Sequence, residues 1–179
     1  MRPDGADGKR GSMMGRARSA AAEMQQGRVR DARTASTAVD EERPLDYARQ
    51  LGLEVSDLWS LIDKVEAGFA YDTFRRFMAQ TLIAKSQLAE LVGIAERTLS
   101  RRKDAGWLTP DESERLLRVA RVFGSAVALF EGDRETARRW LSTPKRALGA
   151  RVPLEMIKTE VGAREVEDLI LRIEHGVFT

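Results

Sequence analysis

Apolar residues after position 44 recur every three or four places, the spacing that puts side chains on one face of an α-helix. Sustained apolar–polar alternation rich in β-branched residues, the pattern of a strand, is not found in the sequence. We therefore predict an all-α fold. The apolar positions of the successive predicted helices are Leu58, Leu61, Ile62 and Val65; Phe74, Phe77 and Met78; Leu88, Leu91 and Val92; Leu116, Leu117, Ala120, Phe123, Val127 and Phe130; Trp140 and Leu141; Leu154, Met156 and Ile157; and Val166, Leu169, Ile170 and Ile173.

Capping residues and glycines predict where these helices begin and end. Thr109-Pro110-Asp111-Glu112 is the most complete start signal, because its threonine can cap the helix, its proline fixes the first helical φ and its glutamate closes a capping box. Pro153 can open a later helix in a similar way. Further caps or first residues are expected at Ser56, Asp72, Ser86 and Asp133, and stops at Gly68, Gly93, Gly132, Gly162 and Gly176.

Segment 85–103 has the spacing of a helix-turn-helix. Such a unit needs a small residue where its helices approach, a residue that accepts positive φ in the turn, and an apolar residue that locks the second helix onto the first. Counted from the first residue of the segment, Ala89, Gly93 and Leu99 fill these roles at positions five, nine and fifteen. The second helix is predicted over about 95–103.

Charge is distributed unevenly along the chain. The sequence carries 30 Lys or Arg against 28 Asp or Glu, so its net charge of +2 indicates neither nucleic acid nor membrane. Residues 71–121, however, hold ten basic against seven acidic side chains, and four of the seven residues at 97–103 are basic. With Leu99 facing inward, the second helix offers base-edge donors and phosphate-binding cations. The candidate DNA-binding residues are Arg97, Thr98, Ser100, Arg101, Arg102 and Lys103, with Arg102 and Lys103 better suited to phosphates.

Two interpretations of this basic cluster stay open. The cations can lie against DNA, or the helix-turn-helix can serve packing alone, with its arginines in solvent. Glu96 and Asp104 lie within the cluster and weaken its positive field. If DNA is bound, a single copy should therefore bind modestly, and we expect a homodimer on two half-sites.

Composition removes several other classes of function. The sequence has no cysteine, which excludes disulfides, zinc–thiolate sites and thiol nucleophiles, and His175 is its one histidine, which excludes a histidine-based metal cluster. No apolar run approaches the roughly 18 residues that a membrane span needs. We expect a cytoplasmic protein that is not an enzyme and has no catalytic residues, metal or cofactor.

Residues 1–44 form a compositionally separate tail. They contain no Leu, Ile, Phe, Trp or Tyr and are rich in Gly, Ala, Ser and Arg. Such a segment cannot bury enough apolar surface to offset the entropy lost on ordering, so we predict that it is disordered. A contact between its basic residues and DNA phosphates is left open.

A series of short motifs runs from about residue 58 to the end of the chain. Its most specific elements are Arg97-Thr98-Leu99 with Arg101-Arg102, Glu112-Ser113 with Arg115-Leu116, Trp140-Leu141, Pro144, Leu148-Gly149, Pro153-Leu154, Gly162 and Arg172-Ile173-Glu174-His175-Gly176. In this order the motifs resemble the MbcA/ParS/Xre antitoxin family. Ala150-Arg151 departs from it, since the family often has a second glycine there, followed by a small polar residue.

This resemblance implies an antitoxin of a type II toxin–antitoxin system. The implied partner is a RES-domain toxin encoded in the same operon, an enzyme that consumes NAD. The antitoxin would block the toxin's active site and, together with it, repress the operon by binding operator DNA. The implied organisation is a disordered tail at 1–44, an Xre-like helix-turn-helix and dimerisation region at 45–130, and a toxin-binding region at 131–179.

The end of the chain is a candidate plug for the toxin. Val177 and Phe178 follow the predicted Gly176 stop, so they can enter a pocket, although Phe178 can equally fold back onto the core. Trp140 can be a core residue or an interface anchor. The toxin-binding residues expected from the resemblance are Trp140, Leu148, Pro153, Leu154, Arg172, His175, Gly176, Val177, Phe178 and Thr179.

Two alternative functions compete with the antitoxin. One is a stand-alone helix-turn-helix transcriptional regulator whose C-terminal region only dimerises. The other is a pole-localised or scaffold protein. A neighbouring gene for a RES-like toxin would favour the antitoxin over the regulator.

Overall fold

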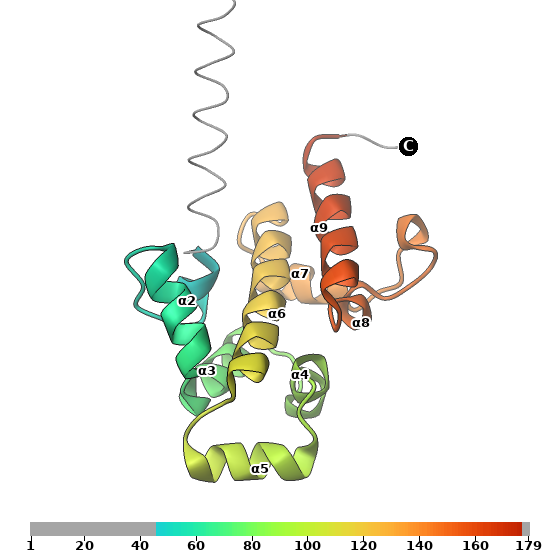
Figure 1. The fold of residues 1–179 in the computed structure, drawn as a ribbon. Coiled ribbons are helices and arrows are strands. Elements are labelled where there is room, and N and C mark those ends of the chain that lie inside the picture. Colours follow the sequence, from blue (N-terminus) through green and yellow to red (C-terminus); the bar gives the residue numbers. More distant parts are fainter. Residues whose placement is uncertain (1–45, 177–179) are drawn as a thin grey trace, which may run out of the picture. The chain divides into compact units, whose positions relative to one another are not determined.

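The computed structural model describes residues 46–176, which lie within one compact unit; the predicted disordered tail falls outside this range. Within it, β-type pairing is limited to two isolated bridges, Ala70–Trp107 and Lys145–Arg151. The all-α prediction is confirmed. After a helical stretch at 46–50, the elements are α2 (Leu58–Ala67), α3 (Tyr71–Thr81), α4 (Lys85–Val92), α5 (Glu96–Ala105), α6 (Pro110–Leu129), α7 (Arg134–Leu141), the 3₁₀ turn η1 (Arg146–Leu148), α8 (Pro153–Met156) and α9 (Glu160–Glu174) (Figure 1).

The start of α6 agrees with the capping box predicted from the sequence. The Thr109 hydroxyl accepts the Glu112 backbone N–H at 3.3 Å, and the Glu112 carboxylate accepts the Thr109 N–H at 2.8 Å. Pro110 is the first helical residue. Asp133 caps α7 as expected, accepting the Thr136 N–H at 3.0 Å.

Three other predicted starts are displaced. Asp57 rather than Ser56 caps α2, because its carboxylate accepts the Ser60 N–H at 2.7 Å. α3 begins before Asp72, which lies in its first turn and pairs with two arginines of the same helix. α4 begins one residue before Ser86. Each shift keeps the predicted apolar face.

The prediction that Gly162 ends a helix is wrong. The residue lies in the first turn of α9, whose cap Thr159 accepts the Gly162 N–H at 3.1 Å. A Cβ at position 162 would fall 2.1 Å from the carbonyl oxygen of Met156. Glycine is therefore required because α8 and α9 approach each other closely, and the sequence spacing alone does not separate this cause from a helix stop.

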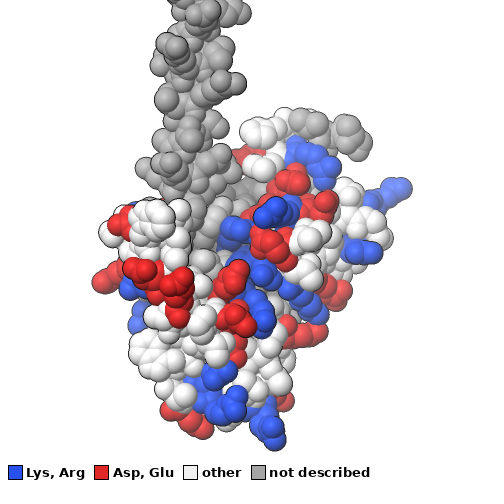
Figure 2. All heavy atoms as spheres, in the orientation of Figure 1, with Lys and Arg blue, Asp and Glu red and all other residues white. Residues whose placement is uncertain are grey.

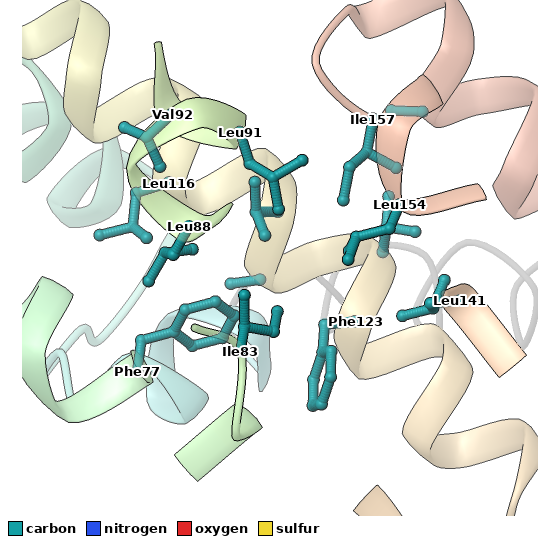
Figure 3. Close-up of a cluster of buried hydrophobic side chains, with 14 of the residues drawn as sticks. Phe77, Ile83, Leu88, Leu91, Val92, Leu116, Phe123, Leu141, Leu154 and Ile157 are labelled. Carbon is teal, nitrogen blue, oxygen red and sulfur yellow. The ribbon is translucent and has the colours of Figure 1, made fainter. Parts of the chain in front are cut away.

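α6 is the central helix of the core. It lies between α2 and α9 in Figure 1 and packs against α2, α4, α7 and α9. Figure 3 shows side chains from both halves of the chain meeting around it, namely Phe77, Ile83, Leu88, Leu91, Val92, Leu116, Phe123, Leu141, Leu154 and Ile157.

This core is continuous across residue 130. The regions 45–130 and 131–179 are therefore not separately packed units within the described residues. Their division into DNA-binding and toxin-binding parts stays a prediction about function. Because α6 borders both, it fixes how the end of α5 and the end of α9 are presented on the surface.

Candidate DNA-binding and partner-binding surfaces

α4 and α5 form the predicted helix-turn-helix. Gly93 ends α4 in the left-handed region, with a φ of 72°, and lets Ile94 donate its N–H to the Ala89 carbonyl at 2.8 Å. Ala89 and Leu99 are 4% and 1% exposed. The geometric roles predicted for Ala89, Gly93 and Leu99 are confirmed.

The outer side of α5 is open to solvent. Leu99 is the one side chain of α5 that is buried. In Figure 2, Lys and Arg side chains gather at the end of the described part where α5 lies in Figure 1, with acidic side chains beside them. Of the candidate DNA-binding residues, Arg97, Ser100, Arg101 and Lys103 are exposed and Thr98 is half-buried.

Arg102 differs from the other cations of α5. Its Nε donates to both carboxylate oxygens of Glu112, at 3.0 and 2.8 Å. The side chains are only 20% and 8% exposed. Arg102 thus joins α5 to α6 through this pair, and the phosphate contact expected for it stays a prediction. Both residues belong to the motifs noted in the sequence, but their positions along the chain do not show that Arg102 and Glu112 are in contact.

Three of the candidate toxin-binding residues are part of the core. Leu148 and Leu154 are 8% and 2% exposed, and Pro153 is also buried. A contact with a partner through these side chains would require the core to repack. In this structure they hold η1 and α8 in place, and a direct contact with a partner stays a prediction.

Trp140 packs against the core, which is one of the two roles that the sequence left open. It is half-buried, its ring centroid lies 6.2 Å from that of Phe130, and the Lys145 ammonium lies 4.8 Å from its ring centroid. Burial lowers the pKa of Lys145 below its ordinary value. One part of the indole packs on the core while another part remains accessible.

The C-terminal end of α9 is accessible. Arg172, His175 and Gly176 are exposed, and Gly176 has a φ of 68°. The other candidate residues, Val177, Phe178 and Thr179, lie outside the described residues. Within 46–176, the candidate partner surface therefore consists of this helix end and the accessible part of Trp140.

A cluster of charges that was not predicted from the sequence lies between α6 and α9. Arg118 and Arg121 of α6 both bind the Glu160 carboxylate at 3.0 Å, and Arg121 also reaches Glu167 at 2.8 Å. Glu167 is therefore paired across the two helices and is partly buried. No spacing rule pairs residues some forty positions apart, so the sequence held no signal for these contacts.

The two glutamates of this cluster differ in their acidity. Burial raises the pKa of Glu167 above its ordinary value, and the charge of Arg121 only partly opposes it. Burial also acts to raise the pKa of Glu160, but hydrogen bonds and charge from Arg121, with Arg164 and Arg118, hold that pKa below its ordinary value. These four side chains join α6 to α9. Arg118 is 14% exposed, and Arg121, Glu160 and Glu167 are 21–41% exposed.

Residues 46–176 contain no group of three or more His, Asp or Glu side chains placed to hold a metal ion. None of the helices found there has the length and apolarity to cross a membrane.

Comparison with known families matches two adjacent parts of the chain. Residues 60–121 match the family described as the antitoxin Xre-like helix-turn-helix domain. Residues 125–176 match the antitoxin Xre/MbcA/ParS C-terminal toxin-binding domain. The first match contains α4 and α5, and the second contains α7, η1, α8 and α9.

Curated relatives give a consistent result. The chain is 43% identical to Antitoxin Xre of Yersinia enterocolitica over 132 residues, which cover 73% of this chain and 89% of that protein. It is 30% identical to Antitoxin Xre of Pseudomonas putida, covering 69% of this chain and 76% of that protein. It is 25% identical to the Prs ADP-ribosylating antitoxin of a Sphingobium species, over 65% and 79%.

Proposed function

The chain belongs to the Xre antitoxin family of toxin–antitoxin systems, and on this premise we propose that it inhibits a RES-domain toxin encoded in the same operon. The observation that carries the proposal is the match of 125–176 to a toxin-binding domain. We further propose that the toxin consumes NAD and that the antitoxin blocks its active site. The protein itself would be a cytoplasmic non-enzyme without a cofactor.

The contact with the toxin is proposed to start from the free end of α9. Arg172 and His175 are exposed there, and the chain continues into Val177, Phe178 and Thr179. Apolar residues that follow a helix end suit insertion into an enzyme pocket. Trp140, with an accessible part and a buried part, is proposed as an anchor beside it.

The proposed second activity is repression of the shared operon through α5. Arg97, Thr98 and Arg101 would read base edges in the major groove, and Lys103 would bind phosphate, with Ser100 able to reach either. The open outer side of α5 supports this assignment. Arg102 is left out of this set because it is paired with Glu112.

DNA binding is proposed to use a homodimer, because operators of helix-turn-helix proteins place two half-sites about one helical turn apart. α2 leaves Leu58, Trp59 and Ile62 exposed, with Trp59 at 75%. Leu58 and Ile62 also line the groove between α2 and α6, whose charged residues are of both signs. A second copy would therefore cover the exposed apolar face of α2.

The dimer contact can be tested by the oligomeric state. We expect Trp59→Glu to convert a dimer of the full chain into monomers in light scattering. Leu82→Glu is the matched control, since Leu82 is 62% exposed on a different helix junction. Unchanged dimerisation in Trp59→Glu would contradict the α2 contact, and loss in both variants would point to general misfolding.

Toxin inhibition can be tested by co-expression. The full chain should protect cells from the toxin encoded beside it and prevent NAD depletion. A chain lacking 177–179 should still be produced and still bind promoter DNA, but protect less. Equal protection would contradict the proposed plug. If the neighbouring gene encodes no toxin, a stand-alone regulator becomes the better account.

A further inference from the structure

We propose that Glu112 is a positioning residue for DNA recognition, which acts by holding Arg102 and thereby fixing the end of α5. This inference rests on the proposed DNA binding by α5. It assigns Arg102 to the support of the recognition helix and removes it from the set of phosphate-binding cations. Glu112 itself would not touch DNA.

The Glu112 carboxylate serves two helices at once. Oε2 accepts the Thr109 backbone N–H at 2.8 Å, which completes the capping box of α6. The same oxygen accepts Arg102 Nε at 2.8 Å, and Oε1 accepts it at 3.0 Å. The group that starts α6 is therefore also the group that holds the last turn of α5.

α5 needs such a holding contact because its own packing is sparse. Leu99 is its one buried side chain, so packing at that point leaves the orientation of the helix ends weakly determined. At its C-terminal end, Gly106 accepts the Tyr71 N–H at 2.8 Å, which ties the backbone just beyond α5. The Arg102–Glu112 pair adds the side-chain contact that joins this end to α6.

The first turn of α6 is a rigid support for that contact. Ser113, next to Glu112, is fully buried, and its hydroxyl accepts the Phe69 N–H and donates to the Thr109 carbonyl, both at 2.7 Å. Leu108 donates its N–H to the Phe69 carbonyl at 2.8 Å. The carboxylate that holds Arg102 is thus built on a connection whose polar groups are satisfied.

The pair also has an electrostatic consequence. Arg102 is one of four cations at 97–103, and its charge is matched by a carboxylate that is almost completely buried. Phosphate contacts raise affinity for every DNA sequence, whereas base contacts discriminate. By neutralising Arg102, the pair limits the attraction of α5 to DNA of any sequence. The same contact orients α5 and with it Arg97 and Arg101, so the pair favours specificity.

The decisive variant is Glu112→Gln in the full chain. Glutamine can still accept the Thr109 N–H in a capping box, so the start of α6 is kept while the charge that holds Arg102 is removed. We expect affinity for the promoter to fall about tenfold, the size of one misplaced base contact. Affinity for unrelated DNA should stay equal or rise, and the salt dependence should steepen by about one phosphate contact.

Two further variants give the comparison its control. Asp111→Asn removes the same charge from an exposed position in the first turn of α6, so it reports the general effect of a lost carboxylate. Arg102→Gln removes the cation, and we expect it to lower promoter affinity as Glu112→Gln does, with an unchanged salt dependence. Thermal unfolding and binding of the partner toxin check that each variant is folded.

Opposite outcomes would overturn the inference. If Arg102 contacts phosphate directly, Arg102→Gln makes the salt dependence shallower by about one contact, and Glu112→Gln strengthens binding to promoter and unrelated DNA alike. If the pair serves stability alone, both variants lower the melting temperature without changing the ratio of promoter to unrelated affinity. Failure of the wild-type chain to bind its promoter would instead contradict the proposed function.

Discussion

α5 and α9 are attached to the same central helix in different ways. α5 has ten residues and buries Leu99, whereas α9 has fifteen and buries Ala163, Val166, Leu169 and Ile170. α9 is further fixed to α6 by Arg118 and Arg121 through Glu160 and Glu167, while α5 has the Arg102–Glu112 pair at one end.

This difference corresponds to what each helix would present to its partner. A helix that enters a DNA groove must keep most of its circumference free, so little of its surface can be used for packing. A helix that only carries an exposed end can bury one whole face. α5 is consequently sensitive to single contacts, and α9 is expected to tolerate the loss of one.

The largest effect expected from this comparison comes from Leu99→Ala. Removing the one buried side chain of α5 should cost about 2–5 kcal/mol of unfolding free energy and abolish promoter binding at temperatures where the rest of the domain stays folded. Ile170→Ala, a matched truncation in α9, should leave α9 attached through its other contacts. Urea unfolding and promoter titration of both variants check this contrast. Equal loss of promoter binding in the two variants would contradict the expected difference between α5 and α9.

Gly162→Ala should destabilise the junction of α8 and α9. The added Cβ would meet the Met156 carbonyl oxygen, so α8 must shift, at a cost of about 1–3 kcal/mol typical of overpacking. We expect reduced toxin binding in a pull-down and retained promoter binding. A variant as stable as the wild type would show that the close approach seen here is not needed.

Arg97→Ala and Arg101→Ala should each reduce promoter affinity by about 1–3 kcal/mol if the side chains read bases. Stability should change little, because both residues are exposed. Arg139→Ala, an exposed arginine of α7, is the matched control. Anisotropy titrations over a salt series measure the effect, and equal affinities of all three variants on the promoter would exclude base reading by α5.

The smallest effect expected is a pair of opposite pH dependences in the α6–α9 cluster. The pKa of Glu160 is lowered in the folded state, so its charge stabilises the protein above its ordinary value of 4.5 and this stabilisation is lost as the pH falls. The pKa of Glu167 is raised, so protonation favours the folded state as the pH falls through that raised value.

Two variants isolate these contributions. In urea unfolding at a series of pH values, the stability advantage of the wild type over Glu160→Gln should shrink in acid. The stability of the wild type relative to Glu167→Gln should instead rise as the pH falls. Slopes of the same sign would show that the two carboxylates do not differ in environment.

Local features of this chain could be predicted from its sequence. The capping box at Thr109, the turn at Gly93 and the buried Leu99 each depend on residues within fifteen positions of one another. Helical spacing also gave the core side of α9. The motif order identified the family, which the comparisons confirmed.

Contacts between distant helices could not be predicted. The sequence pattern assigned Arg102 to phosphate binding and Leu154 to toxin binding, without showing that Arg102 pairs with Glu112 or that Leu154 is buried, because exposure depends on which neighbour lies across the core. Gly162 was interpreted as a helix stop because glycine is favoured both where a helix ends with a positive φ and where two backbones approach closely. The helices could therefore be predicted from the sequence. Which residues support the fold and which are exposed to a partner could be seen only in the structure.

The central claim is that α5 binds promoter DNA independently of the surface that holds the toxin. It is tested most directly by titrating labelled promoter DNA with the toxin–antitoxin complex assembled from the double variant Arg97→Ala/Arg101→Ala. We predict that the complex still forms and that its promoter affinity is at least about tenfold below that of the wild-type complex. Wild-type promoter affinity, or failure of the variant to bind the toxin, would contradict the claim.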